Sequence, residues 1–377
     1  MKSWCLILCM GMASTSYAQN KEISRDWTSF YQILDANFTE ETKFRLTASV
    51  KVVTDDSTGA ASLWAYVVNK NGEEGFFDNM YNRPIQSDEW YTYVIEGEAD
   101  ENADKLYFGG ICFQNGQFYF DNFALYVENK EKEGEFDPVE IENASFEQKI
   151  ENNQISDWTE GGYSGDVRVK EFTISSSDSS FHKNQSLLVE GKGIEPDTTY
   201  MIGPANGFSP QIGTLVTMLN NLSSRVEQTV QLLDQEETDF LLDDKANSIG
   251  ALVMHLAAAE AYYQVFTFEG RGFNEEEKEK WQVALNLGQK VRNQFKGKSI
   301  DYYLGIYKEV RQKTIEELQK RDDAWLNKAQ PGRGTNNHFS WFHVMEHQSS
   351  HLGQILMLKK RFPEEDGMVQ QEIDTDH

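Results

Sequence analysis

Alternating hydrophobic and polar residues dominate the first half of the chain. From Phe44 to Val52, every second residue is hydrophobic and the residues between are polar. Successive side chains of a strand point to opposite faces, so this pattern predicts a strand with one buried face. Similar patterns, separated by turn residues, follow at residues 63–68, 90–95, 106–113 and 118–127. Together they predict an antiparallel β-sandwich over residues 21–195.

A charged connection interrupts this region at residues 129–137, and strand-like patterns resume at residues 139–146, 167–174 and 186–190. Two organisations remain open. Either the strands before and after the connection complete one sandwich with a permuted strand order, or the strands after it form a truncated second module. For strand aromatic residues such as Trp64 and Trp90, packing within the sheets is favoured over a sugar-stacking platform.

The period changes from two to 3.6 after a linker rich in Gly and Pro at residues 196–209. Hydrophobic residues between Ile212 and Leu233 recur at steps of three and four, which predicts a long amphipathic helix. Further helices are predicted at residues 246–269, 275–295, 301–319 and 337–361. The second half is therefore predicted to be a helical bundle over residues 210–363, followed by a flexible tail at 364–377.

The last predicted helix contains a cluster of histidines. Residues four apart lie about 40° apart around a helix, so His347 and His351 can direct their imidazoles at one point. A divalent ion needs about three protein ligands. His255 lies in an apolar part of the second helix and should also point inward. His343, one turn before His347, is interpreted as a hydrogen-bonding neighbour of the site or a satisfied interior histidine rather than a ligand.

Several other chemistries lack the residues that they need. Gln348 occupies the position of the catalytic glutamate in the zinc-protease motif, and an amide cannot act as a general base. The sequence contains no Gly-x-Ser-x-Gly elbow, phosphate loop or dinucleotide fingerprint. Glu260 and Glu346 are predicted to be supporting or surface groups, because neither aligns in angle with its neighbouring histidine.

Composition and the N-terminus restrict partners and location. The formal net charge of −26 disfavours nucleic acid and anionic lipid as partners. Lys2, the apolar run that follows it and the small residues before Gln19 predict a signal peptide, residues 1–18, cleaved near Ala18. The mature protein is then expected to be periplasmic or extracellular, without membrane insertion. Cys112 would be its only cysteine, which excludes an intramolecular disulfide.

The segments around His255 and from His347 to Ile355 resemble the DinB-like superfamily of metalloenzymes, over roughly residues 210–363. The resemblance implies an up-down-down-up four-helix bundle in which His255, His347 and His351 bind a divalent metal. Zinc, nickel, manganese and iron are not distinguished. Gln354 and Tyr262 are predicted to lie beside these ligands. Leu352 replaces the arginine that is common in this family, which removes a cationic group.

Relatives in this superfamily include thiol-dependent transferases and isomerases. With the predicted signal peptide, which separates the protein from the usual cytoplasmic thiols, we expect an exported metal-dependent hydrolase or transferase that acts on an unknown small molecule. The competing hypothesis is a non-catalytic protein that binds glycan or the cell envelope and contains a structural metal. A homodimer is compatible with both.

Part of the β region is similar to carbohydrate-binding jelly-roll modules. Residues 143–147 with Trp158 resemble the motif that opens such modules, and residues 120–125 the motif that closes them, here in reverse order. This resemblance implies a glycan ligand and a structural calcium ion near Asp121 and Glu147. Ordinary turn hydrogen bonding by these two carboxylates is the alternative.

Overall fold

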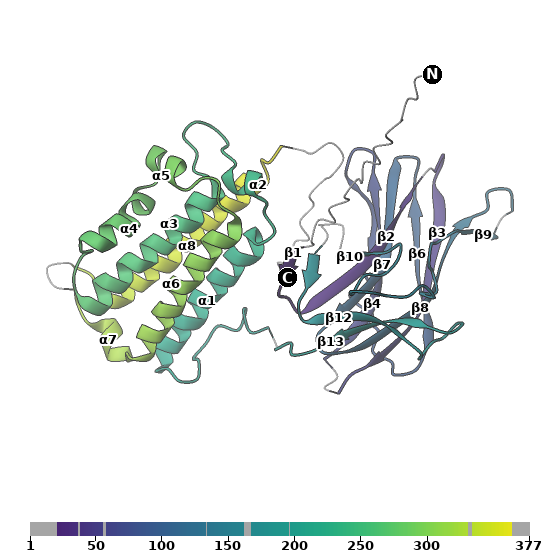
Figure 1. Ribbon diagram of the computed structural model, residues 1–377, viewed down its shortest axis with the longest axis horizontal. Helices are drawn as coiled ribbons and strands as arrows, with labels where there is room; N and C mark the ends of the chain where they lie inside the picture. Colours follow the sequence, from purple (N-terminus) through teal and green to yellow (C-terminus); the bar gives the residue numbers. More distant parts are fainter. Residues whose placement is uncertain are drawn as a thin grey trace, which may run out of the picture. The chain divides into compact units, whose positions relative to one another are not determined.

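The structure is a computed structural model that describes residues 21–363 apart from residues 37, 56–57, 133, 162–166, 196 and 331–333. The chain divides into two compact units, and the boundary between them follows Glu195 (Figure 1). The predicted signal peptide and the predicted tail lie outside the described residues. Within the described ranges, no helix is both long enough and apolar enough to span a membrane.

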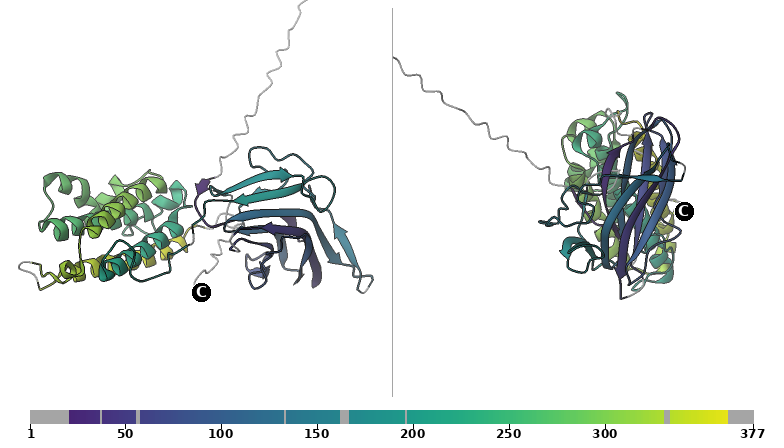
Figure 2. Two further views of the ribbon diagram at one scale, coloured as in Figure 1. Left: turned by 90° about the horizontal axis from the view of Figure 1, so that it is seen from below. Right: turned by 90° about the vertical axis from the view of Figure 1, so that its right-hand side faces the viewer.

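The first unit consists of β-strands, most of them antiparallel (Figure 2). One sheet has five strands in the order β10 (Thr159–Glu160), β2 (Trp27–Asp35), β7 (Ala103–Phe113), β4 (Ala60–Asn69) and β5 (Glu74–Asp78). The second sheet has the order β12 (Phe172–Ser177), β13 (Ser186–Gly191), β8 (Gly116–Glu128), β3 (Thr42–Val53) and β6 (Tyr91–Ala99), with β9 (Phe136–Val139) paired to β8. Strands β1 (Lys21–Ile23) and β11 (Val167–Val169) form a short parallel pair.

The two larger sheets share one hydrophobic core. Phe30 and Phe108 from the five-stranded sheet belong to the same buried cluster as Leu46 and Phe120 from the other sheet. Strand β13, which follows the charged connection, pairs with β8, which precedes it. The residues after the connection thus extend sheets begun before it.

Strand β2 was missed from the sequence, and its burial on both faces gives a reason. Strand β3 alternates between buried and less buried residues, as predicted, except that Ser49 is buried as well, whereas β2 is buried at five consecutive positions, Thr28 to Gln32. A strand buried on both faces shows no period of two, so β2 was not predicted. Trp64 is buried with Tyr31 and Tyr66 in a separate small cluster, which agrees with the packing interpretation of the strand aromatics.

The second unit is helical (Figure 1). Its elements are α1 (Pro210–Val230), α2 (Gln235–Asp239), α3 (Ile249–Gln264), the π-helix η1 (Val265–Glu269), α4 (Glu275–Asn286), α5 (Gln289–Gln294), α6 (Ile300–Gln319), α7 (Asp323–Asn327) and α8 (Asn337–Lys359). The four longest helices run side by side: α3 packs against α6 and α8, and α1 packs against the same two helices.

The predicted helix over residues 275–295 is wrong in one respect, because it is divided into α4 and α5. Leu287 and Gly288 separate the two, and both have positive φ angles, 50° and 82°. This backbone conformation cannot continue a right-handed helix. The predicted helix over residues 246–269 ends as expected before Gly270, whose φ of 70° is left-handed, although its last turn is η1.

Candidate metal centre

Capping residues and apolar composition position the two helices that carry the candidate ligands. Ser248 accepts a hydrogen bond from the Ala251 amide at the start of α3, and Asn336 accepts one from the Phe339 amide at the start of α8. Helix α3 is buried along almost its entire length and is rich in alanine. His255 is therefore carried into the interior, where α3 packs against α8.

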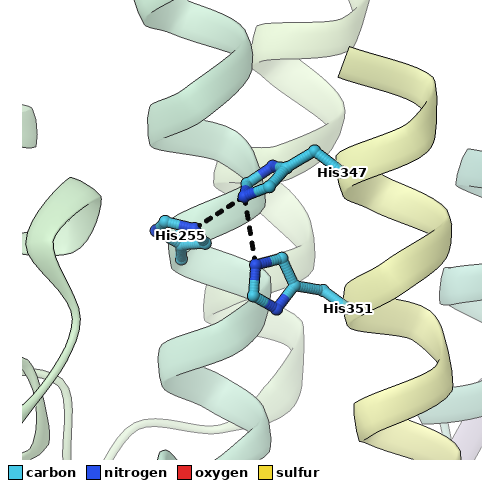
Figure 3. A group of neighbouring side chains, drawn as sticks. All are labelled: His255, His347 and His351. Atoms are coloured by element: carbon cyan, nitrogen blue, oxygen red, sulfur yellow. Dashed lines mark hydrogen bonds between the residues drawn. The ribbon is translucent and has the colours of Figure 1, made fainter. Parts of the chain in front are cut away.

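The structure brings His255, His347 and His351 together (Figure 3). The Nε2 atom of His347 lies 3.0 Å from Nε2 of His255 and 3.1 Å from Nε2 of His351. One ligand atom from each of the three residues lies within 4.8 Å of the other two. Among the residues that the structure describes, this is the only such group of three or more potential metal ligands.

Hydrogen bonds on the far side of two rings determine which nitrogen is free. Nδ1 of His255 donates to the Ala284 carbonyl at 2.8 Å, and Nδ1 of His351 donates to Oε1 of Gln354 at 3.0 Å. In their neutral forms, His255 and His351 must then present unprotonated Nε2 atoms toward His347. The hydrogen bond that His351 donates to Gln354 is of the kind that orients imidazoles at metal sites.

Burial favours the neutral form of all three histidines. It lowers the pKa of His255 and of His351. It also lowers the pKa of His347 to about 4, with further contributions from the neighbouring His351 and His255. Near pH 7 the cluster therefore consists of neutral imidazoles, which is the form that binds metal ions.

The three residues fit a divalent cation. Two ligands at roughly 2.0–2.1 Å from a tetrahedral ion are about 3.3 Å apart, close to the two distances observed here. Without a cation, two unprotonated Nε2 atoms face His347, which can donate a hydrogen from its own Nε2 to only one of them. A cation at the centre of the group would bind all three lone pairs at once.

Fold and site together define the second unit as a helical, histidine-based metal-binding unit. Residues 214–362 match the family model described as mycothiol-S-transferase. This match confirms that the C-terminal half is DinB-like. A crystal structure of a DinB-like protein from Bacillus cereus ATCC 10987 is similar, with 17% identity and a TM-score of 0.32; the match covers 42% of this chain and 95% of that one. The curated proteins contain no significant match.

His343 and Tyr262 lie outside the group of three clustered histidines. His343 is partly exposed, and its Nδ1 lies 3.2 Å from a carboxylate oxygen of Glu346. Its ring also stacks on His347, with centroids 6.0 Å apart. Tyr262 lies in an aromatic cluster and stacks on Phe266, 5.9 Å between centroids.

The structure gives no support to the predicted calcium ion. Asp121 accepts hydrogen bonds from the amides of Phe181 and His182. Glu147 accepts hydrogen bonds from the amides of Asn184 and Gln185. The two carboxylates thus secure one loop, which is the turn hydrogen bonding that was the alternative.

A buried polar network beside the site was missed from the sequence. Glu260 was predicted to be a supporting or surface group, but it is 1% exposed and paired with Arg311. Two signals could have revealed this. Glu260 interrupts a run of alanines, and Arg311 follows Tyr307 by four residues on the stripe of α6 that faces the interior.

Proposed function

We propose that the helical unit is a metal-dependent transferase, with His255, His347 and His351 as ligands of one divalent ion. The observation that carries this proposal is the convergence of three neutral imidazoles, two of them fixed by hydrogen bonds at Nδ1. An ion held by three protein ligands keeps a further position open, where it lowers the pKa of a coordinated thiol or water.

A thiol is the proposed nucleophile, because the matching family model is described as mycothiol-S-transferase. In such a reaction the thiol loses its proton to solvent and its sulfur forms a bond to an electrophilic carbon. The leaving group departs from that carbon with the bonding electron pair. The chain itself keeps the three histidines uncharged by burying them, and it orients two of the imidazoles through hydrogen bonds to Ala284 and Gln354.

Hydrolysis is the second candidate, with water in place of the thiol. The predicted signal peptide favours it, because the usual low-molecular-weight thiols are cytoplasmic. Under either chemistry we propose that α1, α3, α6 and α8 form an up-down-down-up four-helix bundle. We further propose that the β unit is jelly-roll-like and positions the protein or its substrate, with glycan as a candidate ligand.

The first test is metal content. Purified protein should contain about one equivalent of a transition metal by mass spectrometry, and His351→Ala should lose it. His338→Ala is the matched control, because His338 is exposed on the same helix. A wild-type protein that takes up no zinc, cobalt, nickel, manganese or iron at stoichiometric amounts would overturn the metal site.

The second test separates the reactions. Metal-loaded protein is incubated with cysteine or glutathione and 1-chloro-2,4-dinitrobenzene, and in parallel with p-nitrophenyl acetate in the absence of thiol. Thiol conjugation that is lost in His351→Ala supports the transferase, whereas ester cleavage alone supports the hydrolase. Metal that raises the melting temperature but supports neither reaction would favour the non-catalytic alternative.

A further inference from the structure

A buried network of polar side chains joins four helices close to the three histidines. Arg311 of α6 is at its centre, and it pairs with Glu260 of α3 through Nε at 2.8 Å and Nη2 at 2.7 Å. Its Nη1 donates to the Leu219 carbonyl of α1. Its Nη2 also donates to Oε1 of Gln348 of α8, at 3.1 Å. One guanidinium thus connects α1, α3 and α8.

The remaining polar atoms of the network are also paired. Nε2 of Gln348 donates to the Tyr307 hydroxyl, which accepts a further hydrogen bond from Ser223 at 3.1 Å. Thr314 donates to Oε1 of Glu260 at 2.6 Å. Because the carboxylate and the guanidinium cancel, the network adds no net charge next to a metal site. What the network can contribute to metal binding is therefore the position of the helices that carry the ligands.

The network adjoins the ligands in sequence on both helices. Gln348 directly follows His347, and Glu260 lies five residues after His255, about 7.5 Å along α3. Consecutive residues of a helix point about 100° apart, so His347 faces α3 while Gln348 faces the interior toward α6. Rotation or translation of α8 would break the contacts of both residues together.

Apolar packing alone would define this register weakly. The hydrophobic effect is non-directional, and the buried surface of α3 near the site is largely alanine, at positions 257, 258, 259 and 261. Hydrogen bonds from a planar guanidinium are directional, and their strength changes when the donor–acceptor distance changes by tenths of an ångström. Ligand atoms must be held within about 0.5 Å of their productive positions for tight metal binding.

We propose that Glu260, Arg311 and Gln348 are positioning residues that fix the register of α3 and α8, so that the three imidazoles converge on the metal. The proposal rests on the metal site of the proposed function. It accounts for a fully buried ion pair in a helical core, where apolar residues of similar size would give equal or greater stability.

The test replaces the network with apolar residues of similar volume. Glu260→Leu, Arg311→Met and Gln348→Leu are combined in one variant, and Gln348→Met is made alone, since it removes no charge. The control combines Glu227→Leu with Lys308→Met, which removes a partly exposed ion pair between α1 and α6. Cobalt binding is followed by its visible absorption, and the stability of metal-free protein by circular dichroism at 222 nm.

We expect the triple variant to melt at or above the wild-type temperature without metal, yet to bind cobalt at least roughly tenfold more weakly, with altered ligand-field bands. Gln348→Met should show the same change to a smaller extent, and the control none. Wild-type affinity and spectrum in the triple variant would overturn the proposal. Should that variant not fold, an unchanged affinity and spectrum in Gln348→Met would overturn it instead. A wild-type protein that binds no cobalt would refute the metal site itself and the proposal with it.

Discussion

Removing Arg311 alone should destabilise the helical unit far more than removing any surface charge. In Arg311→Met, Glu260 keeps its buried carboxylate but loses the cation that forms two hydrogen bonds with it. The two side chains are only 6% and 2% exposed, so water cannot replace the lost partner. Breaking such a buried pair costs about 3–5 kcal/mol.

For a helical unit of this size that cost corresponds to a fall in melting temperature of about 6–20 °C. Circular dichroism at 222 nm isolates the effect, because the helices of the second unit dominate that signal. The matched comparison is Lys308→Met, whose partner Glu227 is partly exposed and can be solvated. That substitution should cost no more than about 1 kcal/mol.

Adding Glu260→Leu to Arg311→Met should recover most of the lost stability, because the unpaired buried carboxylate is then gone. The coupling between the two positions is obtained from a double-mutant cycle. If Arg311→Met lowered the melting temperature no more than Lys308→Met does, the pair would not be desolvated in solution. Such a pair would not fix the register of α3 and α8.

Three further predictions test other parts of the structure. Metal-free protein should lose stability as the pH falls from about 6.5 to 4. The folded state holds the pKa of His347 near 4, so the unfolded chain binds protons first. In thermal melts, His347→Gln should flatten this pH dependence. In protein lacking residues 1–18, Cys112 should not react with dithionitrobenzoate until the chain unfolds, since burial raises the pKa of its thiol; rapid labelling of native protein would contradict its burial. Gly109→Ala should destabilise the β unit by about 1–3 kcal/mol in urea unfolding, because a Cβ there overlaps the Phe30 carbonyl. Gly305→Ala has open space around the added Cβ and should stabilise α6 by about 0.5–1 kcal/mol in the same assay.

Elements whose two faces differ in environment were predicted well from the sequence. Strand β3 lies within two residues of its predicted bounds, and helix α6 begins one residue before its predicted start. Each has one face in the core and one in solvent, which produces a clear period in the sequence. Strand β2 and the short helices α2 and α7 were missed, because a strand buried on both faces and a helix of five residues show no such period.

The sequence by itself determined that a strand-rich half precedes a helical half, and that His347 and His351 share one helix face. It also indicated that His255 points inward, because that histidine lies in an apolar segment. Only the tertiary structure decided that these residues converge, that Ala284 and Gln354 fix two of the rings, and that Arg311 joins Glu260 to Gln348. The reason is physical: spacing within a helix specifies a direction for each side chain, whereas convergence depends on the register between helices distant in the chain.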